Sequence, residues 1–370
     1  MRVLQGVRVL DFSGLLPGPL ATLLLAEAGA EVIKIEKPTG DEMRGYTPRV
    51  GSVSVNFPQL NRGKRSIAID LKADGALASL APLIESADVI VDQFRPGAMA
   101  RLGLGYEDVR RINPSIIYCS ITGYGQTGPK SDVAAHDLNY VGDAGLLSLV
   151  ASRDGSPPLP PALIADIAGG AYPAVMNILL ALLQRDRTGD GCFLDISMSD
   201  NVLTFLYWAL AEGVGAGEWP KPGSRLTTGG SPRYNIYRTS DNRFIAAAPI
   251  EERFWTLFCD LIGLDREYRC IDADPQATIS AVADAIAQRT AQAWTEVFAA
   301  ADVCCSVVRT VEEAMEDPHF LARGLFNRRV ATEEGSMVAV PVPISDIFRS
   351  QEELDRYPEL GEHNEQLLVE

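Results

Sequence analysis

The sequence predicts an α/β fold in which a parallel sheet is built from strands that alternate with helices. Apolar runs of strand length occur at 7–12, 31–35, 66–71, 87–91 and 115–121. The first strand is followed by a loop, an apolar helix and a second strand, which is the order of a parallel crossover unit. Of the 370 residues, 46% are hydrophobic and 22% are charged, which is typical of a globular protein with a sizeable core.

The first half of the chain contains the predicted elements of this sheet in order. The run V-R-V-L-D-F at 7–12 is a predicted buried strand, and a Gly/Pro loop at 13–19 leads into an apolar helix over 20–28. The elements that follow are strands at 31–35 and 66–71, a helix over 75–86, strands at 87–91 and 115–121, a loop-rich stretch to 161, a long apolar helix over 162–183, a strand at 193–196 and a helix over 199–212.

A different unit is predicted after a Gly- and Pro-rich linker at 213–231. Alternating runs at 234–238 and 244–249 flank the turn Ser240-Asp241-Asn242, which is a hairpin pattern. Further helices are predicted over 252–262 and across 277–301, with loops beyond 323. At roughly 150 residues per domain, the length agrees with two domains.

The large domain is Rossmann-like in outline, but its first loop does not have the phosphate-binding fingerprint of dinucleotide enzymes. That loop reads G-L-L-P-G-P at 14–19 rather than G-x-G-x-x-G. Pro17 and Pro19 remove backbone donors at the position where a pyrophosphate would need them. The sequence therefore argues against a nicotinamide or flavin dehydrogenase.

The formal net charge of −16 argues against a nucleic-acid partner, because phosphate backbones are bound by basic faces. A small anionic ligand needs only a local cluster of Lys and Arg. The N-terminal residues lack a signal-peptide pattern, so we expect a cytoplasmic protein. Asp166, Pro173 and Asn177 interrupt the apolar helix over 162–183, which predicts a buried helix and no membrane span.

The cysteine pattern predicts neither a disulfide framework nor a metal site. No C-x-x-C pair and no zinc-like His-Cys spacing is present, and the adjacent pair Cys304-Cys305 is poorly placed for a disulfide. We expect buried free thiols at all six positions, which are Cys119, Cys192, Cys259, Cys270, Cys304 and Cys305.

A set of short segments, in this order and spacing, resembles the class III CoA-transferase family, also called the CaiB/BaiF family. No single segment is specific, but together they cover nearly the whole chain. They are V-R-V-L-D-F with L-P-G-P, G-A-E-V-I-K-I-E-K-P at 29–38, N-R-G-K-R-S-I-A-I-D-L-K at 61–72, F-R-P-G at 94–97, G-Y-G-Q-T-G-P at 123–129, R-T-G-D-G near 187 and G-E-H-N-E-Q-L-L at 361–368.

The resemblance implies one of two reactions. Transferases of the family move CoA between carboxylates, with an aspartate nucleophile and mixed-anhydride and thioester intermediates. The α-methylacyl-CoA racemases keep that aspartate and add a histidine in a G-H-D-I-N-Y segment. This chain has A-H-D-L-N-Y at 135–140, with His136, and L-I-A-D-I-A-G-G at 163–170, with Asp166. Both residues together, and the short chain, point to a racemase or epimerase of 2-methylacyl-CoA thioesters; a CoA transferase is the alternative.

The chemistry of racemisation explains why these two residue types are needed. Removal of a weakly acidic proton beside a thioester carbonyl requires a positioned base and stabilisation of the enolate oxygen. Histidine suits one face of the carbon, because its unperturbed pKa is about 6.5. A carboxylic acid suits the other face if burial raises its pKa. The apolar neighbours of Asp166 favour this, and we expect burial to outweigh the helix dipole. The same helix start is a candidate source of N–H donors for the thioester oxygen.

Structural readings of the same residues stay open at this point. His136 alone would be read as a hydrogen-bonded loop histidine, and Asp166 as a helix-capping carboxylate. Asp137 is interpreted as a supporting residue. By resemblance, Glu251 is a third catalytic candidate that would orient the imidazole, and its alternative is an exposed glutamate at a helix start.

CoA recognition is expected in the first domain, where cations would meet the 3′-phosphate and the pyrophosphate. Lys37 stands where racemases often have Arg, so it acts as a point charge without bidentate contacts. Surface solubility is the alternative role for each cation. The residues implied by the resemblance are Lys37, Leu71, Lys72, Gln93, Phe94, Arg95 and Arg101, together with Ala135, Asp137 and Tyr140 of the histidine segment.

The family's architecture implies an interlocked homodimer whose active site lies where one chain's large domain meets the other chain's small domain. The implied parts are a large Rossmann-like α/β domain from 1–212, the linker 213–231, a smaller α+β middle domain from 232–322, and a return segment 323–370 that completes the large domain. No cofactor beyond the CoA moiety of the substrate and no metal are expected. The sequence does not identify the acyl group. A non-catalytic acyl-CoA-binding protein is a third alternative.

Overall fold

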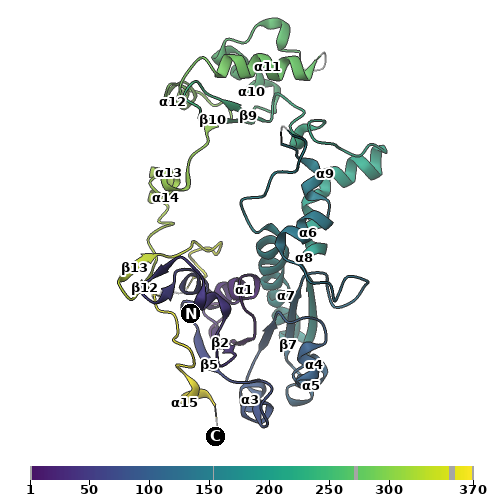
Figure 1. Cartoon of the computed structure of the whole chain (residues 1–370), viewed down its shortest axis with the longest axis vertical. Coiled ribbons are helices and arrows are strands. Elements are labelled where there is room, and N and C mark those ends of the chain that lie inside the picture. Colours follow the sequence, from purple (N-terminus) through teal and green to yellow (C-terminus); the bar gives the residue numbers. More distant parts are fainter. Residues whose placement is uncertain (1, 153, 271–273, 350–354, 369–370) are drawn as a thin grey trace. The chain divides into compact units, whose positions relative to one another are not determined.

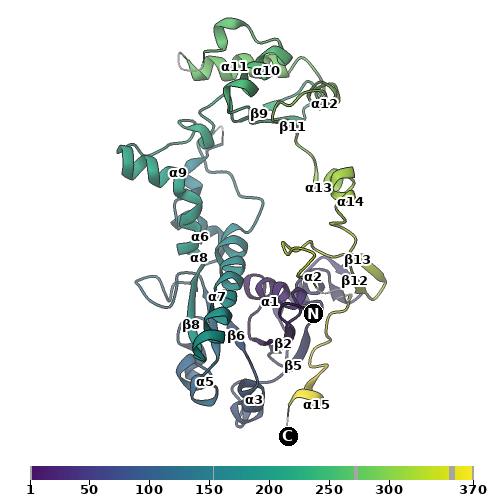
Figure 2. The same ribbon diagram turned by 180° about the vertical axis from the view of Figure 1, so that it is seen from behind.

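The computed structural model describes residues 2–152, 154–270, 274–349 and 355–368, which form two compact units (Figures 1 and 2). The first unit comprises Met1–Ala144, Pro160–Phe205 and Leu321–Glu370. The second unit comprises Gly145–Leu159 and Leu206–Phe320. The domain boundaries expected from the family resemblance stay a prediction.

The first unit is organised around a six-stranded parallel sheet with the order β5-β2-β1-β6-β7-β8. The chain builds the sheet outward from β1 in one direction and then restarts beside β1 with β6, which is the Rossmann order. The predicted strands of this sheet are confirmed. Their bounds are β1 (Arg8–Asp11), β2 (Glu31–Glu36), β5 (Arg65–Ala68), β6 (Val89–Asp92), β7 (Ile117–Thr122) and β8 (Cys192–Ser197).

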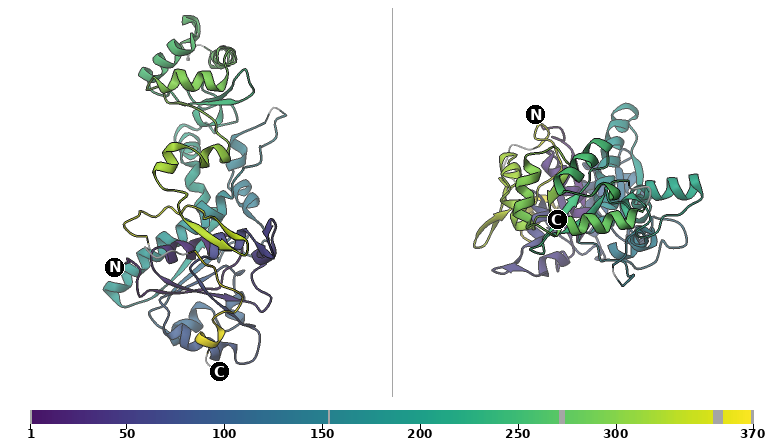
Figure 3. Two further views of the ribbon diagram at one scale, coloured as in Figure 1. Left: turned by 90° about the vertical axis from the view of Figure 1, so that its left-hand side faces the viewer. Right: turned by 90° about the horizontal axis from the view of Figure 1, so that it is seen from above.

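Helices cover both faces of this sheet, as its continuous apolar strands require (Figure 3). On one face α1 contacts β1 and β2, and α7 contacts β7 and β8. On the other face α3, α4 and α5 pack in one cluster with Leu10, Ile33, Ile67 and Ile90 of the strands. The helices are α1 (Pro17–Glu27), α2 (Asn56–Asn61), α3 (Ala76–Glu85), α4 (Ala98–Arg101), α5 (Tyr106–Ile112), α6 (Asp137–Asp143), α7 (Tyr172–Thr188) and α8 (Met198–Val202).

The C-terminal segment returns to the first unit and pairs with the edge of its sheet. The amide of His363 donates to the carbonyl of Ser66 at 2.9 Å, and the Asn364 side chain exchanges hydrogen bonds with the backbone of Ala68 at 2.8 and 3.0 Å. Short helix α15 (Asn364–Leu367) follows. Loops were predicted beyond 323, and this was wrong in part, because β12 (Arg329–Thr332) and β13 (Gly335–Val338) form a hairpin. Its strands are short and polar, so they lack an apolar strand signal.

The second unit contains an antiparallel sheet of order β11-β10-β9 packed on helices. The predicted hairpin is confirmed, with Asn242 in the left-handed conformation at its turn. Trp255, Phe258 and Trp294 fill its core. The elements are β9 (Asn235–Arg238), β10 (Phe244–Ala247), α10 (Glu252–Ile262), α11 (Pro275–Ile286), α12 (Ala291–Ala299), β11 (Cys305–Val307), α13 (Val311–Met315) and α14 (Pro318–Ala322), the last of which continues into the first unit.

Two predicted helices are interrupted. The helix expected across 277–301 is divided into α11 and α12, because Thr290 caps a new helix through its side chain and Asp241 accepts the amide of Ala291 at 3.1 Å. The helix expected over 199–212 is also irregular. It consists of α8, a 3₁₀ turn at Leu203–Leu206, α9 (Tyr207–Leu210) and π-helical turns at Ala211–Ala216. Apolar periodicity continues across such breaks, so it does not reveal them.

The continuous helical segment Ala165–Thr188 is long and apolar enough to cross a membrane, and 39% of its most apolar window is buried. Length and composition do not distinguish a span from a packed helix, so the absence of a membrane partner stays a prediction. Cys119 and Cys259 are buried free thiols, as expected. Cys270 and Cys304 are exposed, and for these two positions the expectation of burial was wrong.

Candidate functional site

Cavities open at the carboxyl edge of the parallel sheet, where the loops after β1 and β6 diverge, and two of them contain most of the predicted site residues. This is the switch point of a doubly wound sheet, the usual place for a ligand. The first, here called the β2 cavity, has a volume of about 580 Å³ and is bordered by β2 and its following loop. The second, the α6 cavity, has about 420 Å³. Leu15, Gln93 and Phe94 line both, and these three residues are called the throat.

The β2 cavity brings together five of the residues predicted to bind CoA. These are Lys37, Leu71, Lys72, Gln93 and Phe94. Lys37 is paired with Glu42 at 3.5 Å, and both side chains are more than half exposed. Asp70 lines the same cavity. The cations of this cavity therefore face carboxylates that compete with an incoming phosphate.

The α6 cavity brings together both predicted catalytic residues. His136 and Asp166 line it, with Arg95, Ala135 and Tyr140 of the predicted binding set. His136 is exposed and precedes α6 as its N-cap residue, and its amide donates to Oδ1 of Asn139 at 3.0 Å. An accessible imidazole and a half-buried carboxyl therefore share one cavity.

The start of α1 closes the helix terminus that would bind a pyrophosphate in a dinucleotide enzyme. Pro17 and Pro19 have no N–H, and the amide of Gly18 donates to Oε1 of Gln93 at 3.1 Å. A Cβ at Gly18 would overlap the Ser13 side chain, so the loop depends on glycine there. This geometry agrees with the rejection of a dinucleotide site, and it ties the throat residue Gln93 to α1.

Asp166 lies at the start of a π-helical segment, Ala165–Ala171, that continues into α7. This segment packs closely against α8. A Cβ at Gly169 would lie 2.5 Å from the carbonyl oxygen of Met198 in α8, so this contact requires glycine. Asn201 also donates to the Gly169 carbonyl at 2.7 Å. Single π-helical turns inside α-helices occur frequently at functional sites.

The backbone amide of Asp166 donates to Oδ1 of Asp137 at 2.9 Å, and the amide of Ile167 donates to the Leu163 carbonyl. These two amides are therefore already used, and the supply of a donor for the thioester oxygen by another amide of this helix start stays a prediction. Asp137 is 6% exposed and supports Asp166 from outside the cavity lining.

The electrostatic setting of Asp166 favours its protonated form. Burial, with a smaller contribution from the charge of Asp137, raises the pKa of Asp166 to about 6, against the opposing effect of His136. Burial is the largest of these influences on the pKa of Asp166, and its balance against the helix dipole stays a prediction. A carboxyl with this pKa can both accept and donate a proton near neutrality.

Tyr140 is fixed by the loop that follows β7. Its hydroxyl donates to the Ala135 carbonyl at 2.7 Å, and its ring covers Gly123, where any Cβ would overlap it. In the same loop the Gln126 amide donates to the carboxylate of Asp195 at 3.0 Å. The segment at 123–129 therefore positions the wall of the α6 cavity.

Comparisons with known proteins place these residues in a family. The model of the family described as CoA-transferase family III matches residues 4–364. The chain belongs to CoA-transferase family III. It is 36% identical to the α-methylacyl-CoA racemase of Mus musculus, covering 100% of this chain and 93% of that protein. It is 33% identical to the acetyl-CoA:oxalate CoA-transferase of Acetobacter aceti, over 99% and 95%. The crystal structure of Rv3272 from Mycobacterium tuberculosis matches with a TM-score of 0.87 at 28% identity, covering 100% of this chain and 99% of that one.

Three predicted site residues of this family III chain are not among the lining residues of the two cavities. Arg101 ends α4 and is exposed, outside both cavity linings as the described residues define them. Asp137 is the buried support described above. Glu251 is the exposed N-cap residue of α10 in the second unit, so its predicted role beside His136 stays a prediction.

Several lining residues were not singled out from the sequence. Leu15 belongs to the loop of the L-P-G-P segment, and Thr122 ends β7. Both follow strands of the sheet, so the rule that ligands bind at carboxyl ends of parallel strands could have found them. Met198, which directly follows β8, lines the α6 cavity by the same rule, and Asn139 lies in the histidine segment at 135–140. Among residues 2–152, 154–270, 274–349 and 355–368, no group of three or more His, Cys, Asp or Glu side chains is arranged to hold a metal ion.

Proposed function

We propose that this family III chain is a racemase or epimerase of 2-methylacyl-CoA thioesters. The observation that carries the proposal is that His136 and Asp166 line one cavity, the first accessible and the second with a pKa raised to about 6. A 1,1-proton transfer requires two groups that each exchange a proton near neutral pH. A transferase nucleophile would require only the carboxylate.

In the proposed reaction one group removes the α-proton and the other returns a proton to the opposite face. The base takes the proton, and the C–H electron pair moves into the thioester to form an enolate. The second group then donates its proton to the α-carbon, and the enolate electrons re-form the carbonyl. His136 and Asp166 exchange these roles for the two epimers. Arg95, which lines the same cavity, is the proposed stabiliser of the enolate oxygen.

The CoA moiety is proposed to lie in the β2 cavity, with its pantetheine passing the throat toward the α6 cavity. Lys37 and Lys72 would meet phosphates there. Leu15, Gln93 and Phe94 border both cavities, which supports this path. The α-carbon of a thioester would then enter the cavity that contains His136.

The alternative is a CoA transferase in which Asp166 attacks a thioester carbonyl. The chain is 36% identical to the racemase and 33% identical to the oxalate transferase, and these similar values support the transferase as a second candidate. In that reaction the Asp166 carboxylate displaces the CoA thiolate to form a mixed anhydride, and the thiolate then attacks the Asp166 carbonyl and releases the donor acid, which leaves an Asp166 thioester. An acceptor carboxylate displaces the thiolate from that thioester to form a second anhydride, and the thiolate attacks the acceptor's carbonyl to give the new acyl-CoA and free Asp166. His136 would then have a structural role.

A homodimer is also proposed, on the basis of an exposed apolar face. Met176, Leu180 and Leu183 of α7 are each 58% exposed. Exposed apolar patches of this kind mark interaction surfaces. A partner subunit would cover the face and would offer the second unit of another copy, including Glu251, to the site.

Incubation of a single epimer of a 2-methylacyl-CoA in deuterated water separates the two reactions. Racemisation with deuterium at the α-carbon, and without any acceptor acid, supports the proposal. A strict requirement for a free carboxylate, with an Asp166 thioester trapped by hydroxylamine, supports the transferase. His136→Ala should slow racemisation by roughly 10²- to 10⁴-fold. The matched control His319→Ala changes a histidine of α14 and should leave the rate unchanged.

A further inference from the structure

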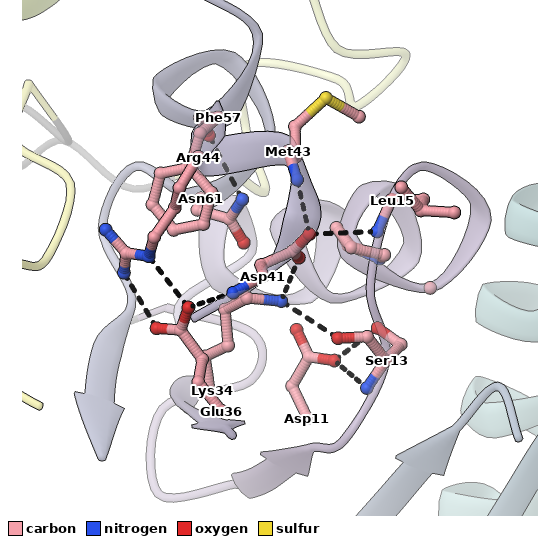
Figure 4. Close-up of polar contacts among 12 residues, drawn as sticks. Asp11, Ser13, Leu15, Lys34, Glu36, Asp41, Met43, Arg44, Phe57 and Asn61 are labelled. Atoms are coloured by element: carbon pink, nitrogen blue, oxygen red, sulfur yellow. Dashed lines mark hydrogen bonds and ion pairs between the residues drawn. The ribbon is translucent and has the colours of Figure 1, made fainter. Parts of the chain in front are cut away.

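A buried ion pair, Lys34 with Asp41, lines the β2 cavity (Figure 4). Ion pairs that contribute only to solubility are normally exposed, so this one needs another explanation. The Lys34 ammonium lies 2.9 Å from Oδ2 of Asp41, with side-chain exposures of 0% and 2%. Desolvation of two charges is costly, and such pairs are poor sources of stability. The pair is therefore a candidate for a role in geometry.

Both members of the pair hold the loop that follows β1. Lys34 donates to the carbonyl of Ser13 at 2.9 Å. Oδ1 of Asp41 accepts the amide of Leu15 at 3.4 Å and the amide of Met43 at 2.9 Å. Figure 4 shows the contacts from Leu15, Met43 and Lys34 meeting at the Asp41 carboxylate.

Leu15 is the residue that this arrangement constrains. Its φ of 60° is in the left-handed region, which non-glycine residues avoid because the Cβ comes too close to the backbone carbonyl. Such a conformation persists only where surrounding contacts enforce it. Leu15 belongs to the throat, so the enforced conformation lies on the proposed path of the substrate.

The opposite side of the throat is held separately. The Phe94 amide donates to Oδ1 of Asp92 at 2.9 Å, and Gln93 accepts the amide of Gly18. Leu15 is thus the member of the throat whose position depends on Asp41.

Lys34 is charged because several carboxylates surround it. Burial lowers the pKa of Lys34, but the charges of Asp11 and Asp41 outweigh this effect and the pKa is raised. Asp11 is paired in turn with Lys64 at 3.0 Å, with both side chains fully buried. Asp41 also receives support, because its amide donates to Oε2 of Glu36 at 3.0 Å.

We propose that Asp41, braced by Lys34, is a positioning residue that fixes Leu15 at the throat and so aligns the thioester with His136 and Asp166. This inference rests on the proposed placement of CoA in the β2 cavity. It assigns the ion pair an effect on alignment of the bound substrate. Misplacement of a reacting atom by about 1 Å can reduce a rate about 100-fold while binding contacts elsewhere remain.

The test is a double-mutant cycle between Asp41 and Leu15, with equilibrium binding of CoA measured for each variant. Asp41→Asn should lower kcat at least about tenfold with KM and CoA affinity changed less than about threefold. Leu15→Gly accepts the left-handed conformation without constraint, so Asp41→Asn should lower kcat less than about threefold in that background.

The matched control is Glu27→Gln. Glu27 is equally buried and pairs with Arg62 at 2.9 Å, but it lies at the far end of α1. This variant should lower the thermal midpoint without changing kcat, and its effects should add to those of Leu15→Gly. Additive effects of Asp41→Asn and Leu15→Gly, or a loss of kcat by Glu27→Gln equal to that of Asp41→Asn, would overturn the proposal.

If Asp41→Asn does not fold, the paired replacement Lys34→Gln with Asp41→Asn removes both buried charges, and the same cycle is run with it. The two proposals fail in different ways. A wild-type chain that binds CoA but exchanges no α-proton contradicts the racemase function, and the cycle is then run on CoA transfer. A wild-type chain with α-proton exchange and no coupling between positions 15 and 41 contradicts the positioning role alone.

Discussion

The amide of Asp166 donates to Oδ1 of Asp137, the residue that follows His136 in the chain, at 2.9 Å. This one bond joins the π-helical segment to the start of α6, and so joins the two segments that supply the proposed acid/base pair. Asp137 therefore acts on Asp166 in two ways, by a hydrogen bond to its backbone and by a charge that raises its pKa.

Asp137→Asn separates these two effects, because asparagine keeps an acceptor oxygen and removes the charge. The pKa of Asp166 should fall, so the acid limb of the kcat/KM profile, expected near pH 6, should move to lower pH. Burial also raises the pKa of Asp92 to about 6. Asp92→Asn is therefore the control, and a shift of the limb in this variant instead would contradict the assignment to Asp166.

Asp166→Asn should stabilise the fold while it abolishes racemisation. The folded-state pKa of about 6 exceeds the model-peptide value of 3.8, so the folded chain retains a proton that the unfolded chain has released between these pH values. The ionised carboxyl thus destabilises the fold above pH 6, and the destabilisation disappears as the pH falls below 3.8. After allowance for solvent screening, the gain at pH 8 should be about 1–2 kcal/mol.

Chemical denaturation at pH 8 and at pH 4 measures this difference. The gain in the free energy of unfolding should be present at pH 8 and nearly absent at pH 4. An equal gain at both pH values would indicate a packing effect rather than the loss of a buried charge.

Glu42→Gln should improve substrate binding. The Glu42 carboxylate pairs with the Lys37 ammonium at 3.5 Å in the β2 cavity. Removal of this carboxylate frees the ammonium for a phosphate. Because both side chains are exposed, the effect is screened, and KM for the acyl-CoA should fall roughly two- to fivefold at low salt. Glu107→Gln breaks a pair with Arg110 of the same length, 3.5 Å, and should leave KM unchanged. An increase in KM for Glu42→Gln would place the phosphates elsewhere.

Leu180→Glu should disrupt the proposed dimer without unfolding the subunit. Leu180 is 58% exposed on α7, so a charge there costs little in an isolated subunit but much in an apolar interface. Light scattering should detect half the wild-type mass, and activity should fall if a partner completes the site. Leu77→Glu, at an exposed leucine of α3, is the control. An unchanged mass for Leu180→Glu would remove α7 from the interface.

The strands of the sheet were predictable because each is a buried apolar run, and parallel sheets covered on both faces require such runs. The proposed catalytic residues of the α6 cavity were predictable only through family motifs. Nothing in the composition around Ala135 indicates that Asp137 turns inward while His136 stays exposed. That difference follows from the capping geometry at the start of α6, which depends on the loop at 123–129 and its contact with Tyr140.

Other features depended on contacts between distant segments and were not predictable. The helix start at Asp166 was a candidate source of donors for the substrate, but the partner of the Asp166 amide is Asp137, 29 positions earlier in the chain. The Lys34–Asp41 pair also gave no signal, because Lys34 lies in a strand where alternation alone does not show which charged residue is buried. Pairing of buried charges is decided by tertiary packing.

The π-helical segment Ala165–Ala171 makes the site sensitive to chain length. A π-helical turn contains one residue more than an ordinary α-helical turn, so it has the geometry that the insertion of one residue into an α-helix produces. Deletion of one residue between Asp166 and α7 would allow a regular α-helix and would rotate the carboxyl by about 100° around the axis. A change of one codon could thus separate Asp166 from His136 while composition, core and sheet stay the same.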